Sequence, residues 1–354
     1  MRNRLLPTLL AGLLLSSQSA FACTDFAVKT DSNGFIAARS MEWSSDLHSR
    51  LVIHGRGESR KAHSEGGEPI TWKAKFGYVG VDANHLDAIV DGVNERGLSF
   101  GLLWFPVYTR YPEVAAGAKT VDVTDLGSWL MGNFETVDEV KEALKSVTVS
   151  ASNLPSFGGI PTAHLAVHDA KGNHLVVEWI DGKQIVSDNP TTVLTNAPPF
   201  DWQLINLTNF MMVDSKNPKP IQIQGSVLSP PGQGGGFQGL PGDWTPPSRF
   251  VRTCAMLRFA KPAKDTTSGI NLAEHILNAV DIPKGEIRTT VDGQEFTDYT
   301  QWVVIKDLTN PAIYFRSYDN LTLRKLDLKN IDFSGSDKLR YIEISGGAAW
   351  QAVD

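Results

Sequence analysis

The 354-residue sequence holds only two cysteines, Cys23 and Cys254, so at most one disulfide can form within the chain. Beyond one short apolar stretch near the start, no hydrophobic run approaches the ~20 residues that a transmembrane helix requires. Lysine and arginine are scattered and outnumbered by acidic residues. The formal net charge of −6 argues against nucleic acid or an anionic membrane as the main partner. No metal-ligand cluster or cofactor fingerprint stands in a suitable context, so we expect neither a metal nor a cofactor.

The short apolar stretch belongs to a segment with the three-part layout of a cleaved secretory signal peptide. Two arginines precede the apolar run 5–15, and a polar stretch leads to the small-x-small site 20–22. The apolar run is too short to span a bilayer. We therefore expect residues 1–22 to be removed on export. Residues 23–354 would then form a single domain in the periplasm of a Gram-negative cell, without a membrane anchor.

Cleavage after Ala22 would make Cys23 the first residue of the mature chain. A thiol and a free α-amine on one residue form a nucleophile and base pair that needs no further partner. Two other interpretations stay open from the cysteines alone. Lipidation is one, although bulky Phe21 suits ordinary signal peptidase better. A disulfide with Cys254 is the other, although Cys254 lies in an apparently amphipathic helix, where a buried and inert thiol is expected.

Many short segments of alternating polarity predict strands, and four pairs of them predict hairpins. The hairpins would pair 24–30 with 35–39, 88–93 with 98–104, 163–169 with 174–180, and 299–306 with 312–318. Helices are expected at 124–133, 201–211, 247–259 and 270–280, and after a capping box that starts at Thr136. Hairpins in succession with helices in separate groups indicate an α+β layered domain with antiparallel sheets. Segment 215–247, rich in proline, glycine and glutamine, is predicted to be one long loop.

One motif points to a different class of enzyme. Gly97-Leu98-Ser99-Phe100-Gly101 has the spelling of a serine-hydrolase nucleophile elbow, which needs a strand before the serine and a helix after it. Here a hairpin turn precedes Ser99 and an apolar strand follows, so we interpret Ser99 as part of a strand. A serine hydrolase would survive Cys23→Ala and lose its activity with Ser99→Ala.

Five local patterns follow one another along the chain. They are Cys23-Thr24-x-Phe26 at the cleavage site, Arg39-Ser40-Met41-Glu42-Trp43, Asp91–Leu98, Leu194–Trp202, and Leu240-Pro241-Gly242-Asp243-Trp244 leading to Pro247–Arg252. In this order they resemble the choloylglycine hydrolase family, which includes the penicillin V acylases and bile salt hydrolases. The resemblance extends to about Leu328, and Trp43 with Trp104 is similar to the Gram-negative branch.

This resemblance implies a four-layer αββα sandwich of the N-terminal-nucleophile hydrolases, with Cys23 at the end of a central strand. It implies that Cys23 attacks an amide carbonyl with its own α-amine as the base, and that Arg39 lies beside the thiol, where a cation favours the thiolate. Asn196 would donate its side-chain amide to the tetrahedral oxyanion, with the backbone N–H of Trp104 as the second donor. Arg249 would lie on a helix near the active site.

Two positions bear on specificity and on the fit to the family. Members usually have Asp, hydrogen-bonded to the terminal amine, where this chain has Glu42. Glutamate keeps the charge but adds one methylene, which a small shift or a bridging water must absorb. Trp43 and Trp104 would border the acyl site, where two indoles favour flat or long apolar acyl groups. The alternative for both indoles is a place in the core.

The sequence therefore predicts an exported cysteine amidase that hydrolyses the linear amide bond of a small N-acyl molecule. Penicillin V and N-acyl homoserine lactones are the leading substrates, and conjugated bile salts are the runner-up. A periplasmic binding protein or a lipoprotein without enzymatic activity is the remaining alternative. The family resemblance also implies a homotetramer.

Overall fold

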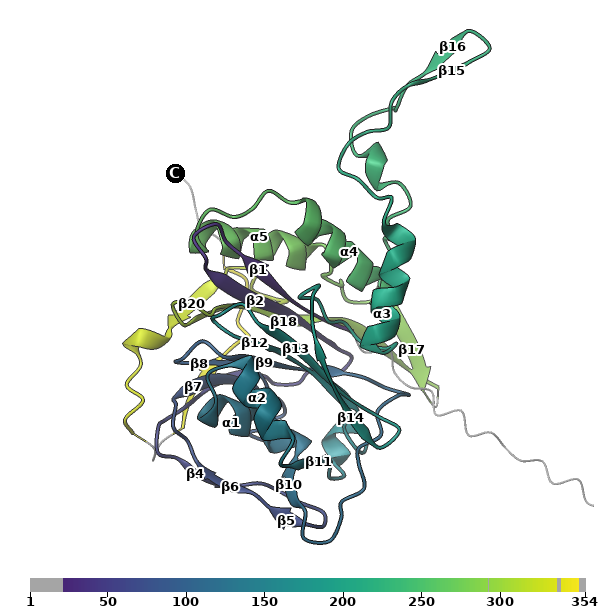
Figure 1. The fold of residues 1–354 in the computed structure, drawn as a ribbon. Helices are drawn as coiled ribbons and strands as arrows, with labels where there is room; N and C mark the ends of the chain where they lie inside the picture. Colours follow the sequence, from purple (N-terminus) through teal and green to yellow (C-terminus); the bar gives the residue numbers. More distant parts are fainter. Residues whose placement is uncertain (1–21, 292, 336–338, 350–354) are drawn as a thin grey trace, which may run out of the picture.

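Two large sheets lie face to face in the middle of the molecule, and helices cover the outer face of each (Figure 1). The computed structural model describes residues 22–291, 293–335 and 339–349. Within these residues the layers follow the order helices, sheet, sheet, helices, which is the predicted αββα sandwich. Neighbouring strands in both large sheets are antiparallel, as the succession of hairpins predicted.

The first sheet contains Cys23. Its strand order is β1-β2-β18-β19-β20, and β17 also pairs with β18. The strands are β1 (Cys23–Lys29), β2 (Phe35–Trp43), β17 (Ile287–Val291), β18 (Gln294–Asp307), β19 (Ala312–Ser317) and β20 (Arg324–Asp327). Its outer face is covered by α4 (Pro246–Phe259) and α5 (Thr266–Asn278), and α3 (Phe200–Leu207) packs against α4.

The second sheet has the order β14-β13-β12-β9-β8-β7-β3-β21. The strands are β3 (Arg50–His54), β7 (Tyr78–Asp82), β8 (Ile89–Asn94), β9 (Ser99–Trp104), β12 (Ala163–His168), β13 (His174–Ile180), β14 (Lys183–Asp188) and β21 (Arg340–Glu343). Its outer face is covered by α1 (Val123–Asn133) and α2 (Val137–Leu144). Thr136 caps α2 in the predicted capping box. Three smaller sheets complete the fold: β4 (Ser59–Lys61) with β6 (Thr71–Lys73), the parallel set β5 (Glu68–Pro69), β10 (Lys119–Asp122) and β11 (Thr148–Ser150), and β15 (Ile221–Ile223) with β16 (Ser226–Leu228).

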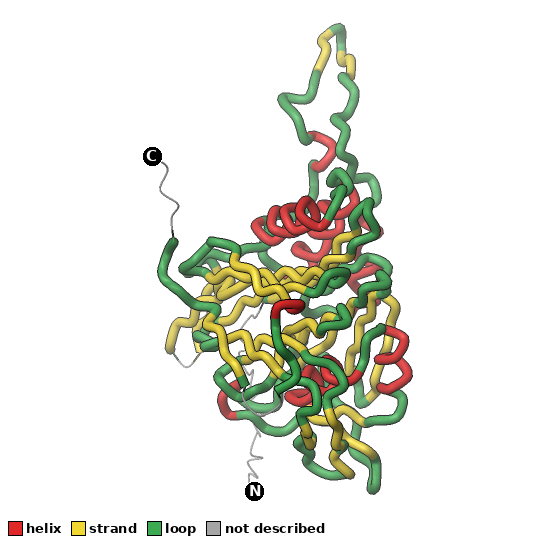
Figure 2. Tube along the Cα trace, turned by 90° about the vertical axis from the view of Figure 1, so that its left-hand side faces the viewer, coloured by secondary structure: helices red, strands yellow, loops and turns green. Residues whose placement is uncertain are grey.

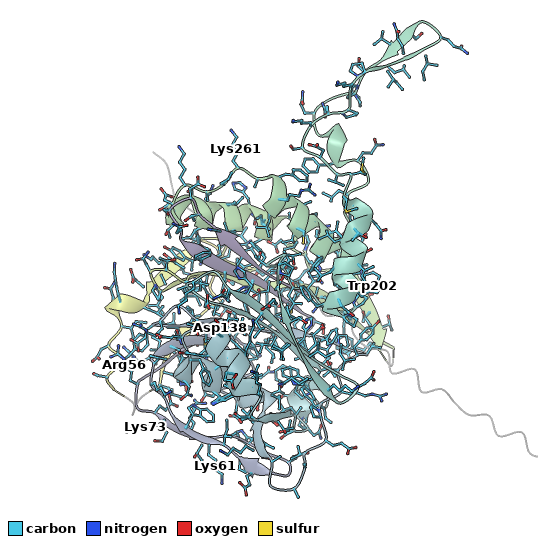
Figure 3. All side chains as sticks on the ribbon, viewed as in Figure 1. Arg56, Lys61, Lys73, Asp138, Trp202 and Lys261 are labelled. Carbon is cyan, nitrogen blue, oxygen red and sulfur yellow. The ribbon has the colours of Figure 1, made fainter. Side chains whose placement is uncertain are left out.

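Alternating side chains on the second sheet build two separate cores. In β12, Ala166 belongs to the core that joins the two sheets to α4 and α5, whereas its neighbours Leu165 and Val167 belong to the core beneath α1 and α2. Charged side chains such as Lys61, Lys73 and Asp138 lie on the outside of the molecule (Figure 3). The buried strands of the second sheet thus face two hydrophobic layers, as an αββα sandwich requires.

All four predicted hairpins are present, with β1–β2, β8–β9, β12–β13 and β18–β19 paired in sequence. The long loop predicted over 215–247 is partly wrong. It contains the β15–β16 hairpin, which projects from the body as an arm (Figures 1 and 2), and α4 begins inside its last residues. Gln224 and Gly225 both have positive φ, which suits a two-residue hairpin turn between short apolar segments. The strands of this hairpin were not predicted, because proline and glycine surround these short apolar segments.

The helices of the described chain are all too short or too polar to cross a membrane. Of the expected signal peptide, residues 1–21 lie outside the described residues. Ala22 is described and is buried directly before β1.

Candidate active site

Cys23 is the first residue of β1, and its side chain is buried between the two sheets. The β1–β2 register places it opposite Met41, with its Sγ 3.9 Å from Met41 Sδ. The expected position at the end of a strand is therefore found. The expectation of a central strand is wrong, because β1 is the first strand of its sheet. Its outer side is instead held by Leu194, which exchanges two backbone hydrogen bonds with Asp25.

Arg39 approaches the Cys23 thiol from β2. Its Nη2 lies 3.7 Å from Cys23 Sγ, and its Nη1 lies 3.5 Å from Asp91 Oδ2. The guanidinium also donates to the carbonyl oxygens of Val90 and Leu102, and no part of the side chain is exposed. Burial works to lower the pKa of Arg39, but Cys23 and Asp91 outweigh it and raise this pKa above its usual value. A permanent cation therefore faces the sulfur.

Asn196 links the backbone of Cys23 to Trp104. Its Oδ1 accepts a 2.7 Å hydrogen bond from the backbone N–H of Cys23, and its Nδ2 donates to the carbonyl oxygen of Trp104 at 2.7 Å. The two residues expected to bind the oxyanion are thus in contact. The recorded contact uses the Trp104 carbonyl and not its N–H. An amide NH₂ group has two hydrogens, so the bond to Trp104 uses only one of the Asn196 donors.

Arg249 reaches the same residues from α4. Its Nη1 donates to Thr24 Oγ1 at 2.7 Å and to the carbonyl oxygen of Cys23, and its Nη2 donates to Asn196 Oδ1 at 2.7 Å. Burial lowers the pKa of Arg249, while the charges of Glu42 and Cys23 oppose that effect. The arginine fixes both the first residue of β1 and the amide beside it.

Glu42 follows Met41 on β2 and is completely buried. Its Oε1 accepts a 2.8 Å hydrogen bond from Thr300 Oγ1, and its backbone N–H donates to the carbonyl oxygen of Ala22 at 3.0 Å. Burial raises the pKa of Glu42 to about 7, although Arg249 and the hydroxyls of Ser40 and Thr300 act to lower it. Glu42 thus lies beside the peptide bond that precedes Cys23. The carboxyl group of Glu42 is hydrogen-bonded to the hydroxyl group of Thr300.

A cavity of about 60 Å³ adjoins Cys23, Arg39 and Met41. Trp43 and Trp104 both line it, with ring centroids 5.2 Å apart at an edge-to-face angle of 88°. Phe157 extends this wall, 5.9 Å from Trp43. The other lining residues are almost all apolar: Leu47, Ala83, Ala88, Ile89, Val90, Leu102, Leu103, Val123, Thr124, Leu154, Pro161 and Ala163. The recess beside the sulfur is therefore apolar apart from Arg39 and Thr124.

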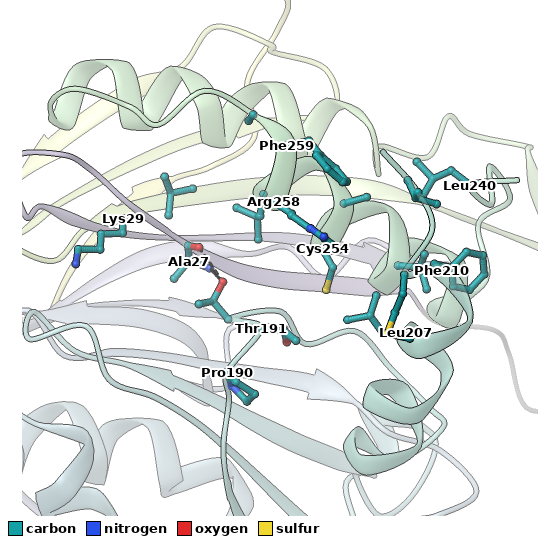
Figure 4. Close-up of a pocket in the computed structure, with 18 of the residues that line it drawn as sticks. Ala27, Lys29, Pro190, Thr191, Leu207, Phe210, Leu240, Cys254, Arg258 and Phe259 are labelled. Carbon is teal, nitrogen blue, oxygen red and sulfur yellow. Dashed lines mark hydrogen bonds between the residues drawn. The ribbon is translucent and has the colours of Figure 1, made fainter. Parts of the chain in front are cut away.

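Cys254 and Ser99 lie in quite different surroundings. Cys254 is on α4 and lines a larger cavity of about 630 Å³ beneath α3 and α4 (Figure 4). Burial raises the pKa of Cys254 to about 12, so this thiol stays protonated near neutral pH. Both cysteines are free, so the disulfide alternative is wrong. Ser99 begins β9 and is followed by strand and not by helix, so it lacks the context of a nucleophile elbow.

Several buried charged residues near Cys23 were not identified from the sequence. Asp91 pairs with Lys306, and Asp25 Oδ1 lies 2.6 Å from His168 Nε2. Each of these residues is buried beside apolar residues of its strand, and a buried charge must find a partner. That rule could have marked them, but the sequence does not indicate which charges meet.

Comparison with known proteins shows which family this chain is similar to. The model for "Linear amide C-N hydrolases, choloylglycine hydrolase family" matches residues 23–341. A bile salt hydrolase/transferase of Clostridium perfringens is 32% identical over 324 residues, covering 90% of this chain and 96% of the relative. A penicillin V acylase of Pectobacterium atrosepticum is 27% identical over 348 residues, covering 92% of this chain and 86% of the relative. A crystal structure of a conjugated bile acid hydrolase variant from C. perfringens superposes with a TM-score of 0.82 at 29% identity, covering 94% of this chain and all of the other.

Proposed function

Since the chain belongs to the choloylglycine hydrolase family of linear amide C–N hydrolases, we propose that Cys23 is its nucleophile and that removal of residues 1–22 completes the active site. One observation carries the proposal: the Cys23 sulfur faces Arg39 at 3.7 Å while the Cys23 nitrogen is held by Asn196 at 2.7 Å. The proposed nucleophile, a cation and the side-chain amide of Asn196 therefore meet at one buried residue. The family match also begins at this residue.

In the proposed reaction, the free α-amine of mature Cys23 takes the proton from the thiol. The thiolate then attacks the amide carbonyl carbon, forming a C–S bond as the carbonyl oxygen becomes an oxyanion next to the Asn196 amide. Collapse of this intermediate breaks the C–N bond, and the ammonium of Cys23 gives its proton to the departing amine. Water hydrolyses the resulting thioester, which releases the carboxylic acid and restores the thiol.

The apolar recess supports a preference for flat or slender acyl groups. Ligand pockets usually measure about 300–1,000 Å³, whereas the recess beside Cys23 holds about 60 Å³. With Trp43 and Trp104 as walls, it suits an unbranched chain, or one aromatic ring after a small outward movement of the walls. We therefore propose penicillin V and N-acyl homoserine lactones as the first substrates to test.

Conjugated bile salts are a second candidate, favoured by the 32% identity to a bile salt hydrolase/transferase. A fused four-ring acyl group needs more room than the recess offers. Its hydrolysis would require the walls that contain Trp43 and Phe157 to move apart, or the rings to lie outside the recess. The prediction is that bile salts are hydrolysed more slowly than phenoxyacetyl amides.

The proposal places the mature enzyme in the periplasm. As long as Ala22 is attached, the nitrogen of Cys23 is an amide without basicity, so the uncleaved chain is inactive. The mass and first residue of the exported protein test this step, and Cys23 must be found as a free N-terminus. An export-blocked chain that hydrolyses amides at the wild-type rate would contradict it.

The substrate assignment is tested by comparing kcat/KM for penicillin V, a chain-length series of acyl homoserine lactones, and glycine- and taurine-conjugated bile salts. Measurements on Cys23→Ser alongside wild type identify hydrolysis that depends on the nucleophile. Hydrolysis of none of these amides by an exported chain with free Cys23 would reject the proposed function. Faster turnover of bile salts would reverse the substrate order only.

A further inference from the structure

A chain of three buried charged side chains leads from the Cys23 sulfur into the space between the sheets. Lys306 Nζ of β18 lies 2.7 Å from Asp91 Oδ1, and Asp91 Oδ2 of β8 lies 3.5 Å from Arg39 Nη1 of β2. All three side chains are completely buried. The chain therefore joins the two sheets, with the positive end of Arg39 directed at Cys23.

The fold makes room for this chain at a glycine. Asp91 lies opposite Gly101 on β9, and a Cβ at Gly101 would come within 3.4 Å of Asp91 Oδ2, 3.0 Å of Asp25 Oδ2 and 3.6 Å of Arg39 Cδ. Three charged groups thus pack over bare backbone. Such groups are costly to bury unless they are paired, so their number and sign at this point are constrained by the interior.

The sum of charges identifies the contribution of Lys306. Without Lys306, the carboxylate of Asp91 would neutralise Arg39 and leave no net charge to attract a thiolate. With Lys306 bound to Asp91, these three side chains keep one net positive charge, at the end that meets the sulfur, while the neighbouring carboxylate of Asp25 has its own partner in His168. Lys306, which follows the apolar run Trp302–Ile305 of β18, has no other ion-pair partner recorded among the described residues.

We propose that Lys306 and Asp91 are positioning residues, which act through Arg39 to hold a net positive charge against the Cys23 thiolate. The proposal rests on the proposed function, because it takes Cys23 as the nucleophile. Other charged or titratable side chains also surround this site: Asp25 on β1, Glu42 on β2, His168 on β12, His174 on β13 and Arg249 on α4. The test therefore changes the charge of the chain in both directions while those groups stay in place.

The experiment measures the rate of iodoacetamide alkylation of Cys23 from pH 5 to 10, by mass spectrometry of the Cys23 peptide in the mature protein. Lys306→Met removes one positive charge, so the midpoint of this pH profile should rise by about one unit. Asp91→Asn removes one negative charge, so the midpoint should fall by a similar amount. Lys306→Arg should keep the wild-type midpoint. The double variant Lys306→Met with Asp91→Asn leaves Arg39 as the single charge of the three. Its alkylation midpoint should therefore lie close to that of wild type.

Asp307→Asn is the matched control, because it changes one buried charge at the next position of β18 and does not contact Arg39. Its alkylation midpoint should equal that of wild type. Shifts of both single variants in the same direction, or unchanged midpoints in folded protein, would overturn the inference. If one single variant fails to fold, the double variant and Lys306→Arg still test it, since a midpoint displaced in either would contradict the charge sum. If iodoacetamide does not alkylate Cys23 in the wild-type protein, or if that protein hydrolyses none of the amides, the proposed function itself would be contradicted.

Discussion

The two cysteines of this chain lie in two cavities that differ in size and in charge. The cavity at Cys254 is about 630 Å³ and mainly apolar, whereas the recess at Cys23 is about 60 Å³ and borders a buried arginine. Burial raises the pKa of Cys254 to about 12, and among the described residues none of the basic side chains of its cavity (Lys29, Arg258 and Lys261) has a hydrogen bond to its sulfur, whereas Arg39 Nη2 lies 3.7 Å from the Cys23 sulfur. A cation in direct contact with the sulfur, and not the space around it, therefore indicates where cysteine chemistry can occur.

Exchanging sulfur for oxygen at each cysteine gives the largest contrast. Cys23→Ser should lower kcat by several orders of magnitude, because a hydroxyl is far less acidic than a thiol. Cys254→Ser, the matched control in the larger cavity, should leave kcat within about twofold of wild type. Steady-state kinetics on the preferred amide measures both. Loss of activity with Cys254→Ser in a folded protein would reverse the comparison.

The side-chain amide of Asn196 lies beside Cys23, and its removal tests whether the surroundings of Cys23 contribute to catalysis. Asn196→Ala should lower kcat by about 10²–10³, through loss of one donor to the oxyanion. The Oδ1 that accepts from the Cys23 nitrogen is lost as well, so the decrease should appear in kcat. A variant with unchanged kcat and a raised KM would make Asn196 a residue that positions substrate.

The walls of the smaller recess should determine the choice of acyl group. Trp43→Ala and Trp104→Ala should each lower kcat/KM for phenoxyacetyl or medium-chain substrates about tenfold or more, with less effect on acetyl substrates. Trp129→Ala is the matched control, since Trp129 and Trp43 are both 7% exposed and Trp129 belongs to the core beneath the second sheet. It should lower the melting temperature without changing the order of substrates. Equal losses for every acyl group would assign Trp43 and Trp104 to the core.

The smallest expected effect is on the pH dependence of stability, through the buried carboxyl group of Glu42 near Cys23. Burial raises the pKa of Glu42 to about 7, above the ~4.3 of an unfolded chain, so folding favours its protonated form. The stability that this form contributes is present below pH ~4.3 and is lost as the pH rises through 7. In the uncleaved chain, the melting temperature should therefore fall from pH 5 to pH 8 by roughly 3 °C more in wild type than in Glu42→Gln. Parallel pH profiles for the two proteins would show that Glu42 does not titrate there.

Local patterns in the sequence predicted most of the fold. The hairpins and helices follow from alternation, turn residues and a capping box, and each of these signals acts over a few residues. The β15–β16 arm was missed because its six strand residues are surrounded by proline and glycine. The edge position of β1 was also missed, because the order of strands in a sheet depends on contacts between distant segments.

For the site, family patterns identified residues that the structure does bring together. Arg39, Asn196 and Arg249 all contact Cys23 by side chain or backbone. Lys306 had no such pattern, because its partner Asp91 is 215 residues away and belongs to the other sheet. Pairing of buried charges across two sheets is a property of the folded chain, and a single sequence does not reveal it.

The burial of Ala22 has a consequence for the order of events during biogenesis. Ala22 is only 4% exposed, and its carbonyl oxygen is already bound by the Glu42 backbone N–H. A processing protease needs an extended and accessible segment, which this peptide bond offers only before the sandwich closes. On the proposed maturation, cleavage must therefore precede closure of the sandwich, and a chain that folds first would keep the Cys23 nitrogen in a peptide bond.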